Sequence, residues 1–318
     1  MNTINITLCT DKNCIMPAGV LLQSICMNNK DENITFHVVA DESVTKVEQK
    51  DLEDIVMKHT GKSIYFHYVD SDGFRKLPSL GTFGTVTQAS YYRLALADIL
   101  PDAVEKVLYM DCDIIVRGSL SSLWKTELTD YALAAVHDPQ ESDMERYARL
   151  GYDSKDGYFN AGVLLINLDY WRSNSSRKLF DDYMQNHRKD ILFHDQDVLN
   201  AVFHDKWFRL PVKFNLMSGF LWKGQYYHDK RFLPEVEEAR KYPVIVHFTG
   251  DKPWEYRLYP NPYSSTFYKY QEHTKWKHVK KTDNRSLRLR IINTVSSALR
   301  KLGLKRSRTM FLDLQPID

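Results

Sequence analysis

Hydrophobic and polar positions along the first part of the chain alternate between two periods. Ile4, Ile6 and Leu8 recur at every second position, which is typical of a strand with one buried face. The next apolar stretch, MPAGVLLQSICMN, predicts a helix entered through Pro17, and ITFHVVAD predicts a second strand. A polar helix over residues 43–59, the strand SIYFHYVD, the helix SYYRLALADIL and the apolar run KVLYMDCDIIV continue this alternation.

Alternating strands and helices predict an α/β fold with a mostly parallel central sheet and helices on both faces. Ligands of such folds bind at the carboxyl ends of the strands, where the sequence has Asp11, Asp70, Asp111 and Asp113. Neither GxGxxG nor GxxxxGK[ST] follows the first strand, which argues against an ordinary dinucleotide fold or a P-loop. If phosphates bind here, a metal ion rather than a glycine-rich loop must hold them.

The segment YMDCDIIV has Asp111 and Asp113 one residue apart at the end of an apolar run. Two carboxylates this close repel each other, and their desolvation is costly unless a cation neutralises them. Carboxylate oxygens suit Mg²⁺ or Mn²⁺, and such an ion bridges a diphosphate and neutralises it as a leaving group. Alone the pair is weak evidence, because acidic pairs also occur in solvated turns.

Several longer segments carry a resemblance to a known family. SYYRLALADILPDAVEKVLYMDCDIIVRGSLSSLW, FNAGVLLINLDYWR, HDQDVLNAVF, KFN and HFTGDKPW occur in the order and approximate spacing of the family 8 glycosyltransferases. Over residues 2 to 260 or so, the chain resembles the bacterial lipopolysaccharide galactosyl- and glucosyltransferases of that family and, more distantly, glycogenin. The resemblance implies a GT-A type, Rossmann-like nucleotide-sugar-binding fold.

The same resemblance implies a retaining, metal-dependent hexosyltransferase. The donor would be a UDP-hexose carrying galactose or glucose, and the metal would be Mn²⁺, with Mg²⁺ as the alternative. Neutral imidazole beside two carboxylates favours Mn²⁺. The acceptor would be a saccharide or glycolipid of lipopolysaccharide or another cell-surface glycan.

Individual residues receive roles from the matching motifs. Asp111, Asp113 and His247 resemble the metal ligands, and Gln196 and Asp195 are the expected catalytic residues near the anomeric carbon. Because a neutral amide is a poor nucleophile, we expect same-face attack, with these two residues positioning the donor. The expected donor-binding residues are Asp11 and Asn13 at the uridine, Gly250 and Lys252 at the diphosphate, Arg93, Asp138 and Asn160 around the sugar, and the loop formed by Asp111, Cys112 and Asp113. Between Gly250 and KPW the chain has one residue fewer than many relatives.

These residues also allow structural interpretations. His247 follows the apolar VIV and fits a core histidine at a strand end, while Asn160 and Asp138 fit turns and Asp195 fits a helix N-cap. A catalytically inactive nucleotide-sugar-binding partner subunit of the same fold stays open as an alternative function. Intact metal ligands favour the active enzyme. A dehalogenase-type phosphatase would need a threonine where this chain has Ile115.

Composition and charge divide the chain in two. Its 318 residues, 43% hydrophobic and 26% charged, suffice for one large α/β domain and an appendage. Twelve basic residues and one acid between Lys275 and Arg308 give that segment a charge of +11, which leaves −9 for the rest of a chain whose net charge is +2. Periodic patterning stops near YRLYPNPYSS. We therefore predict a catalytic domain over 1–260 and a basic tail over 261–318.

Within the tail, apolar residues recur at helical spacing. The stripe consists of Leu287, Ile291, Val295, Ala298 and Leu302, with Ile292 and Leu299 beside it, and Arg288, Arg300, Lys301, Lys305 and Arg306 lie off or beyond it. Such a helix suits the headgroups of an anionic bilayer, at about 1 kcal/mol for each basic residue. The alternatives are packing on the chain's own domain or contact with nucleic acid, for which no motif is present.

The remaining features bear on location. No stretch approaches the roughly 20 apolar residues of a membrane span, and Asp11 and Lys12 interrupt the apolar run that a signal peptide would need. Cys9, Cys14, Cys26 and Cys112 show neither CxxC spacing nor disulfide-scaffold density, so we expect reduced core thiols. We expect a cytoplasmic protein that associates peripherally with the inner face of the cell membrane and binds no nucleic acid.

Overall fold

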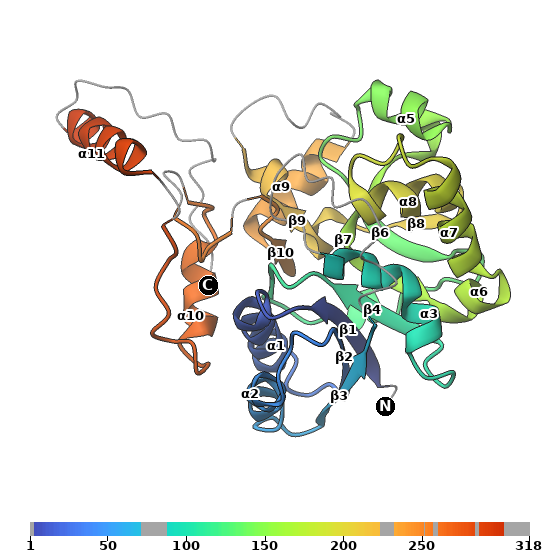
Figure 1. Cartoon of the computed structure of the whole chain (residues 1–318), viewed down its shortest axis with the longest axis horizontal. Helices are drawn as coiled ribbons and strands as arrows, with labels where there is room; N and C mark the ends of the chain where they lie inside the picture. The colour runs from blue at the N-terminus through green and yellow to red at the C-terminus, as the bar shows by residue number, and fades with distance from the viewer. Residues whose placement is uncertain are drawn as a thin grey trace.

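The computed structural model describes residues 3–70, 88–222, 232–250, 252–256, 260–283 and 286–301. A seven-stranded sheet runs through its body (Figure 1). In spatial order the strands are β3 (Lys62–Tyr68), β2 (Ile34–Ala40), β1 (Ile4–Thr10), β4 (Lys106–Met110), β7 (Phe159–Asn167), β6 (Leu133–His137) and β8 (Trp207–Arg209). Only β7 runs antiparallel to its neighbours. The expected mostly parallel sheet is therefore confirmed, with one reversed strand.

Side chains of the central strands point alternately into two apolar cores. On β4, Leu108 and Met110 belong to the core shared with helix α1 (Ile15–Asn28), whereas Val107 and Tyr109 belong to the opposite core. Helices α1 and α2 lie on one side of the sheet and α3 and α6 on the other (Figure 1). A strand covered on both faces is apolar throughout, which explains the continuous run before Asp111.

The structure contains ten further α-helices in the described residues. They are α2 (Lys46–Val56), α3 (Leu96–Ile99), α4 (Ser121–Trp124), α5 (Met144–Leu150), α6 (Leu168–Ser173), α7 (Ser176–Asn186), α8 (His194–Phe203), α9 (Leu233–Lys241), α10 (Ser264–Gln271) and α11 (Leu287–Lys301). The prediction of one helix over SYYRLALADIL is wrong. A 3₁₀ helix, η2 (Gln88–Ala95), leads into the short α3. Arg93 Nε donates to the Ser90 carbonyl oxygen (2.9 Å), an acceptor that a regular α-helix uses for the N–H of residue 94.

A second, three-stranded sheet receives the chain after β4. Its order is β5 (Ile114–Val116), β10 (Ile245–His247) and β9 (Leu216–Met217). The apolar run KVLYMDCDIIV is therefore divided between two sheets. The three residues between β4 and β5, Asp111 to Asp113, form the crossing.

The segment containing α10 packs on the body. Tyr263 and Phe267 are fully buried in the core around α1, and Trp276 lies so close to Gly19 that a Cβ there would be 2.9 Å from the indole Cη2. Residues 261–283, which the sequence analysis placed in the tail, pack on the body. Helix α11 stands away from the rest (Figure 1), and its described side chains are exposed or half-exposed.

Two expectations about the whole chain concern cysteines and membrane spans. Cys9, Cys26 and Cys112 are buried, Cys14 is half-buried, and all four are free thiols, as expected. Among the helices of the described ranges, none combines the length and the hydropathy that crossing a bilayer requires. Leu302 of the predicted tail stripe, Lys305 and Arg306 beyond it, and the side chains of Arg300 and Lys301 lie outside the described residues.

Candidate active site

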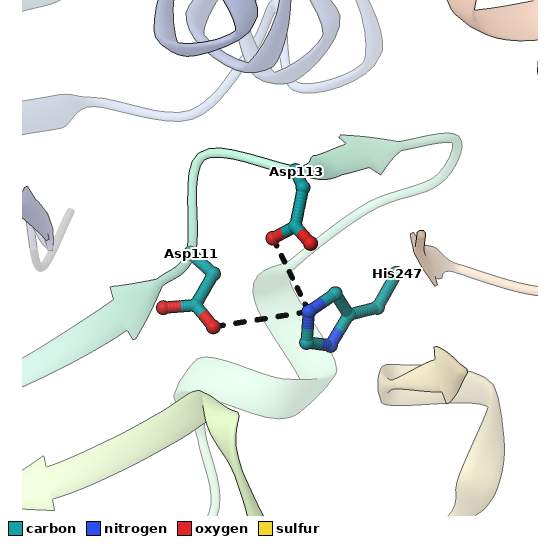
Figure 2. A group of neighbouring side chains, drawn as sticks. All are labelled: Asp111, Asp113 and His247. Carbon is teal, nitrogen blue, oxygen red and sulfur yellow. Dashed lines mark ion pairs between the residues drawn. The ribbon is translucent and has the colours of Figure 1, made fainter. Parts of the chain in front are cut away.

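Two aspartates and a histidine from distant segments meet at the end of the small sheet (Figure 2). Asp111 follows β4, Asp113 precedes β5, and His247 is the last residue of β10. The antiparallel register pairs His247 with Ile114, which brings the imidazole beside the aspartate loop. Its Nε2 lies 3.2 Å from Asp113 Oδ1 and 3.8 Å from Asp111 Oδ2. One ligand atom from each residue lies within 4.8 Å of the others, so the three expected metal ligands share one site.

Gly162 on β7 leaves the space that this cluster occupies. A Cβ at this position would lie 2.8 Å from His247 Nδ1 and 2.9 Å from Asp111 Oδ2, closer than real side chains approach. The Gly162 carbonyl oxygen also accepts a hydrogen bond from the Asp111 N–H (2.8 Å). The residue therefore has to be glycine because of close approach, and its backbone fixes the start of the aspartate loop.

The donor set fits a divalent ion. Two carboxylates and one imidazole suit Mn²⁺ and accept Mg²⁺ less well. The Lys252 ammonium pairs with Asp113. Burial opposes ionisation of Asp113, but the Lys252 charge and the His247 imidazole outweigh it and hold the pKa of Asp113 well below its ordinary value. Asp113 is therefore an ionised carboxylate at neutral pH.

Arg93 connects the aspartate loop to α8. The side chain is almost fully buried, with Nη2 2.7 Å from Asp111 Oδ1 and Nε 2.9 Å from Asp195 Oδ2. The guanidinium carbon lies 4.4 Å from the centre of the Tyr109 ring, and the Tyr109 hydroxyl donates to Asp111 Oδ1 (2.7 Å). Tyr109 is a site residue that the sequence analysis did not single out, although it stands just before the aspartate loop in the matched segment.

Asp195 is a buried carboxyl group in the first turn of α8. Burial raises its pKa to about 6, although the charge of Arg93 acts in the opposite direction. Arg93 Nε–H points to the Ser90 carbonyl, so Asp195 Oδ2 accepts no hydrogen bond from the described residues despite its short distance to Nε. The interpretation of Asp195 as an N-cap is wrong, because the cap position is Phe193.

Four hydrogen bonds hold the Gln196 carboxamide. Its Oε1 accepts from Asn160 Nδ2 (2.9 Å) and from the Ala161 N–H (3.0 Å). Its Nε2 donates to Asp138 Oδ2 (3.3 Å) and to Tyr158 Oη (3.1 Å). Asn160 lies within β7 rather than in a turn, whereas Asp138 both begins a turn through its other oxygen and contacts Gln196.

The segment that leads into α8 is strained and firmly held. His194 has a φ of 53°, in the left-handed region that non-glycine residues rarely adopt. Asp197, fully buried, accepts hydrogen bonds from the backbone N–H groups of Leu192 and Phe193 (both 2.8 Å) and pairs with Arg149 (2.8 Å). Strain of this kind persists where the surroundings fix the conformation. Asp197 thus fixes the turn that presents the first residues of α8.

A hollow of about 550 Å³ opens beside these side chains. Nine expected site residues line it: Asn13, Arg93, Asp111, Cys112, Asp113, Asn160, Asp195, Gln196 and Lys252. Asp138 and His247 do not line the hollow, but Asp138 accepts a hydrogen bond from Gln196 and the His247 Nε2 lies 3.2 Å from Asp113 Oδ1. Asp11 uses Oδ1 to accept hydrogen bonds from the N–H groups of Asn13 (2.8 Å) and Cys14 (3.2 Å), which shapes the loop after β1. Gly250, in the segment after β10, has a φ of 75°.

A second hollow, of about 660 Å³, is lined in part by Met144 and Tyr147 of α5. Its lining includes Glu141, Asp156, Trp207 and Arg209 and shares no residue with the first hollow. Across the described ranges, the Asp111, Asp113 and His247 group is the one cluster with three potential metal ligands, and it belongs to the smaller hollow. We therefore assign the chemistry to the smaller hollow.

Comparisons with known proteins agree with this geometry. The chain is 28% identical to general stress protein A of Bacillus subtilis, over 86% of this chain and 94% of that protein. It is 29% identical to a lipopolysaccharide 1,2-glucosyltransferase of Escherichia coli, over 87% and 86% of the two chains. It is also 29% identical to the lipopolysaccharide 1,3-galactosyltransferase of Salmonella typhimurium, over 86% and 79%.

Solved structures and family models give the same result. The crystal structure of the galactosyltransferase LgtC, in complex with donor and acceptor sugar analogs, superposes with a TM-score of 0.77 at 26% identity, over 86% of this chain and 96% of that one. The fold is thus the GT-A glycosyltransferase fold. The model of glycosyl transferase family 8 matches residues 5–257, which span both sheets and every residue of the candidate site. The protein is a glycosyltransferase and belongs to family 8.

Proposed function

We propose that this glycosyltransferase transfers a hexose, galactose or glucose, from a UDP-hexose to a saccharide acceptor, with retention of the anomeric configuration. The observation that carries the proposal is the Asp111, Asp113 and His247 cluster at the edge of a hollow large enough for a nucleotide sugar. The names of the relatives support lipopolysaccharide or another cell-surface glycan as the product.

We expect metal dependence because two carboxylates and one imidazole form a ligand set that suits a divalent cation. Asp111, Asp113 and His247 would hold Mn²⁺, which when bound supplies positive charge beside a donor diphosphate. Lys252 adds a cation next to Asp113, and a Cβ at Gly250 would meet no described atom within 4 Å. Asp11 and Asn13, on the loop after β1, would contact the uridine.

Retention is best explained by attack from the face of the leaving group. Gln196 Oε1 already accepts two hydrogen bonds, so neither lone pair is available for a nucleophilic attack on the sugar. Its four bonds favour a positioning role next to the anomeric carbon. Same-face attack lets the leaving phosphate accept the acceptor's proton, and the product of a UDP-α-hexose is then α-linked.

Asp195 is the carboxylate next to Gln196 in the lining of the hollow. With a pKa of about 6 and Arg93 alongside, it is mostly ionised at neutral pH and stabilises positive charge that develops on the sugar. A glycosyl adduct trapped on Asp195 would replace same-face attack with a covalent mechanism. A β-linked product, identified by NMR, would contradict retention itself.

A screen of UDP-sugars tests donor, metal and activity together. Purified protein is incubated with Mn²⁺ and each UDP-sugar, and the release of UDP is measured with and without chelator. We expect one UDP-hexose to be hydrolysed and chelation to stop the reaction until Mn²⁺ is returned. Full hydrolysis in excess chelator would contradict the metal site.

The alternative, an inactive partner subunit that only binds the donor, makes a different prediction. Such a protein would bind a UDP-hexose in calorimetry with Mn²⁺ but would release no UDP. The ionised Asp113 and the complete set of ligands favour the enzyme, because losing the metal ligands is the simplest route to an inactive fold.

We also propose that the tail binds the anionic inner face of the cell membrane peripherally. Helix α11 exposes Leu287 (74%), Ile291 (57%) and Val295 (52%), an apolar stripe that the body does not cover. A chain ending after Asp283 keeps the packed α10 segment, so we expect it to stay in solution with anionic liposomes while the full chain sediments at low salt. Equal sedimentation of both chains would remove α11 from the proposal.

A further inference from the structure

Asn215, which precedes β9, lies between the metal ligands and the residues around Gln196. Its side chain is fully buried, and it does not line the hollow. Its Nδ2 donates to Asn160 Oδ1 (2.9 Å), and its Oδ1 lies 3.1 Å from His247 Nδ1. One carboxamide therefore touches both a metal ligand and a residue that holds Gln196.

Backbone N–H groups fix the orientation of each amide in this chain of contacts. The Gly162 N–H, which is always a donor, points to Asn160 Oδ1 (3.0 Å), so that atom is the oxygen. The Asn215 atom facing this oxygen is consequently its NH₂ group. The other Asn215 atom, which faces His247 Nδ1, is then an oxygen and accepts a hydrogen bond.

The consequence for His247 concerns its tautomer. Because Asn215 Oδ1 accepts only, Nδ1 of the imidazole carries a hydrogen. Neutral His247 then has its lone pair on Nε2, the nitrogen that faces Asp111 and Asp113. A ligand histidine needs this arrangement, and a partner on the other ring nitrogen raises its basicity and fixes the ring.

The consequence for Gln196 runs through Asn160. Because Asn160 Oδ1 is occupied by Gly162 and Asn215, its Nδ2 is directed to Gln196 Oε1. We infer that Asn215 is a positioning residue with two separable functions, which are to set the metal-binding tautomer of His247 and to hold Asn160 in place beside Gln196. This inference rests on the proposed metal site.

Two substitutions separate these functions. Asn215→Ala removes both contacts, and we expect the Mn²⁺ dissociation constant, measured from the EPR signal of free Mn²⁺, to rise about ten- to a hundredfold. Asn215→Asp still accepts from His247 Nδ1 but cannot donate to Asn160. We expect Mn²⁺ binding within about threefold of wild type, together with a loss of tenfold or more in the hydrolysis of the preferred UDP-hexose.

Asn29 provides the matched control. It is also buried, and its carboxamide holds the Gly118 carbonyl and the Leu120 N–H far from the site. Asn29→Ala should lower the melting temperature as Asn215→Ala does, yet leave the Mn²⁺ dissociation constant within twofold.

Three results would overturn the inference. The first is Mn²⁺ binding by Asn215→Ala that equals wild type, and the second is an equal loss of Mn²⁺ affinity in Asn215→Ala and Asn215→Asp. If Asn215→Ala does not fold, hydrolysis by Asn215→Asp at the wild-type rate is the third. A wild-type protein that binds no Mn²⁺ would instead overturn the proposed metal site itself, which distinguishes the two failures.

Discussion

The smaller hollow and helix α11 both concentrate charge, but they do so in opposite ways. In the hollow, Arg93 and Lys252 are each paired with aspartates at short range, and burial makes every contact specific. On α11, basic and apolar side chains are exposed, and Arg290 pairs with Asp283 at its start. Buried charges bind a ligand in one geometry. The attraction of exposed charges to an anionic surface is a sum over many residues and depends little on their exact positions.

The sharpest test of this contrast is to remove one buried charge. Asp113→Asn takes away a ligand and leaves the Lys252 ammonium without its carboxylate, so we expect UDP-hexose hydrolysis to fall about a thousandfold. Asp98→Asn, a change at an exposed pair with Arg177, should leave hydrolysis unchanged. Comparable rates in the two variants would contradict the assignment of Asp113 to the metal site.

Burial of Asp195 predicts a pH dependence of stability. Its pKa is about 6 in the folded chain and 3.8 ordinarily, so between these values the folded protein binds more protons than the unfolded chain. This group therefore lowers the free energy of unfolding as pH rises from about 4 to about 6, by on the order of 3 kcal/mol. The side chain of Asp195→Asn does not titrate, so this contribution to the pH dependence of the free energy of unfolding is absent from that variant.

Urea unfolding of both proteins between pH 4 and 7 measures this contribution. The stability of Asp195→Asn relative to wild type should increase through the window and level off above it, whatever constant offset results from the loss of the Arg93 contact. A difference that does not change with pH would mean that Asp195 titrates normally.

Close packing around the metal ligands predicts a smaller effect from a single methyl group. Gly162→Ala would push into His247 and Asp111, so we expect the Mn²⁺ dissociation constant to rise about ten- to a hundredfold. Gly118→Ala is the control, because its Cβ would meet Val244 at an ordinary 3.6 Å. Unchanged Mn²⁺ binding in Gly162→Ala would show that the ligands are not held in place.

The smallest effect is expected on α11, where one charge of many is removed. Arg288→Gln should weaken binding to anionic liposomes about fivefold at low salt, which corresponds to about 1 kcal/mol. Lys155→Gln removes an exposed charge from the body and should have no effect. A loss of much more than tenfold would indicate a specific pocket rather than additive attraction.

Local patterns predicted the elements better than their assembly. The first strand, α1, β2 and α2 were all evident from periodicity, and Thr45 and Glu48 form the capping box at the start of α2. The reversal of β7 and the change of sheet after Asp111 depend on long-range pairing, which leaves no local signal.

The same distinction holds for the site. Asp111 and Asp113 stand out in the sequence because only Cys112 separates them, but their meeting with His247 depends on the register between β5 and β10. Asn215 lies in the matched segment KFN, yet its buried contacts to His247 and Asn160 emerge only when β9 is placed beside β10. Residues that act through other residues have no chemical signature of their own.

The contact between Gly19 and Trp276 has a consequence for synthesis of the protein. Helix α1 is made among the first elements, but the indole that covers it is made near the end of the body, just ahead of α11. Until then the nascent chain keeps an apolar surface of α1 uncovered, which exposes it to aggregation and to chaperones. Translation of residue 276 therefore completes the body, and the ribosome adds α11 only after every part of the donor pocket has been made.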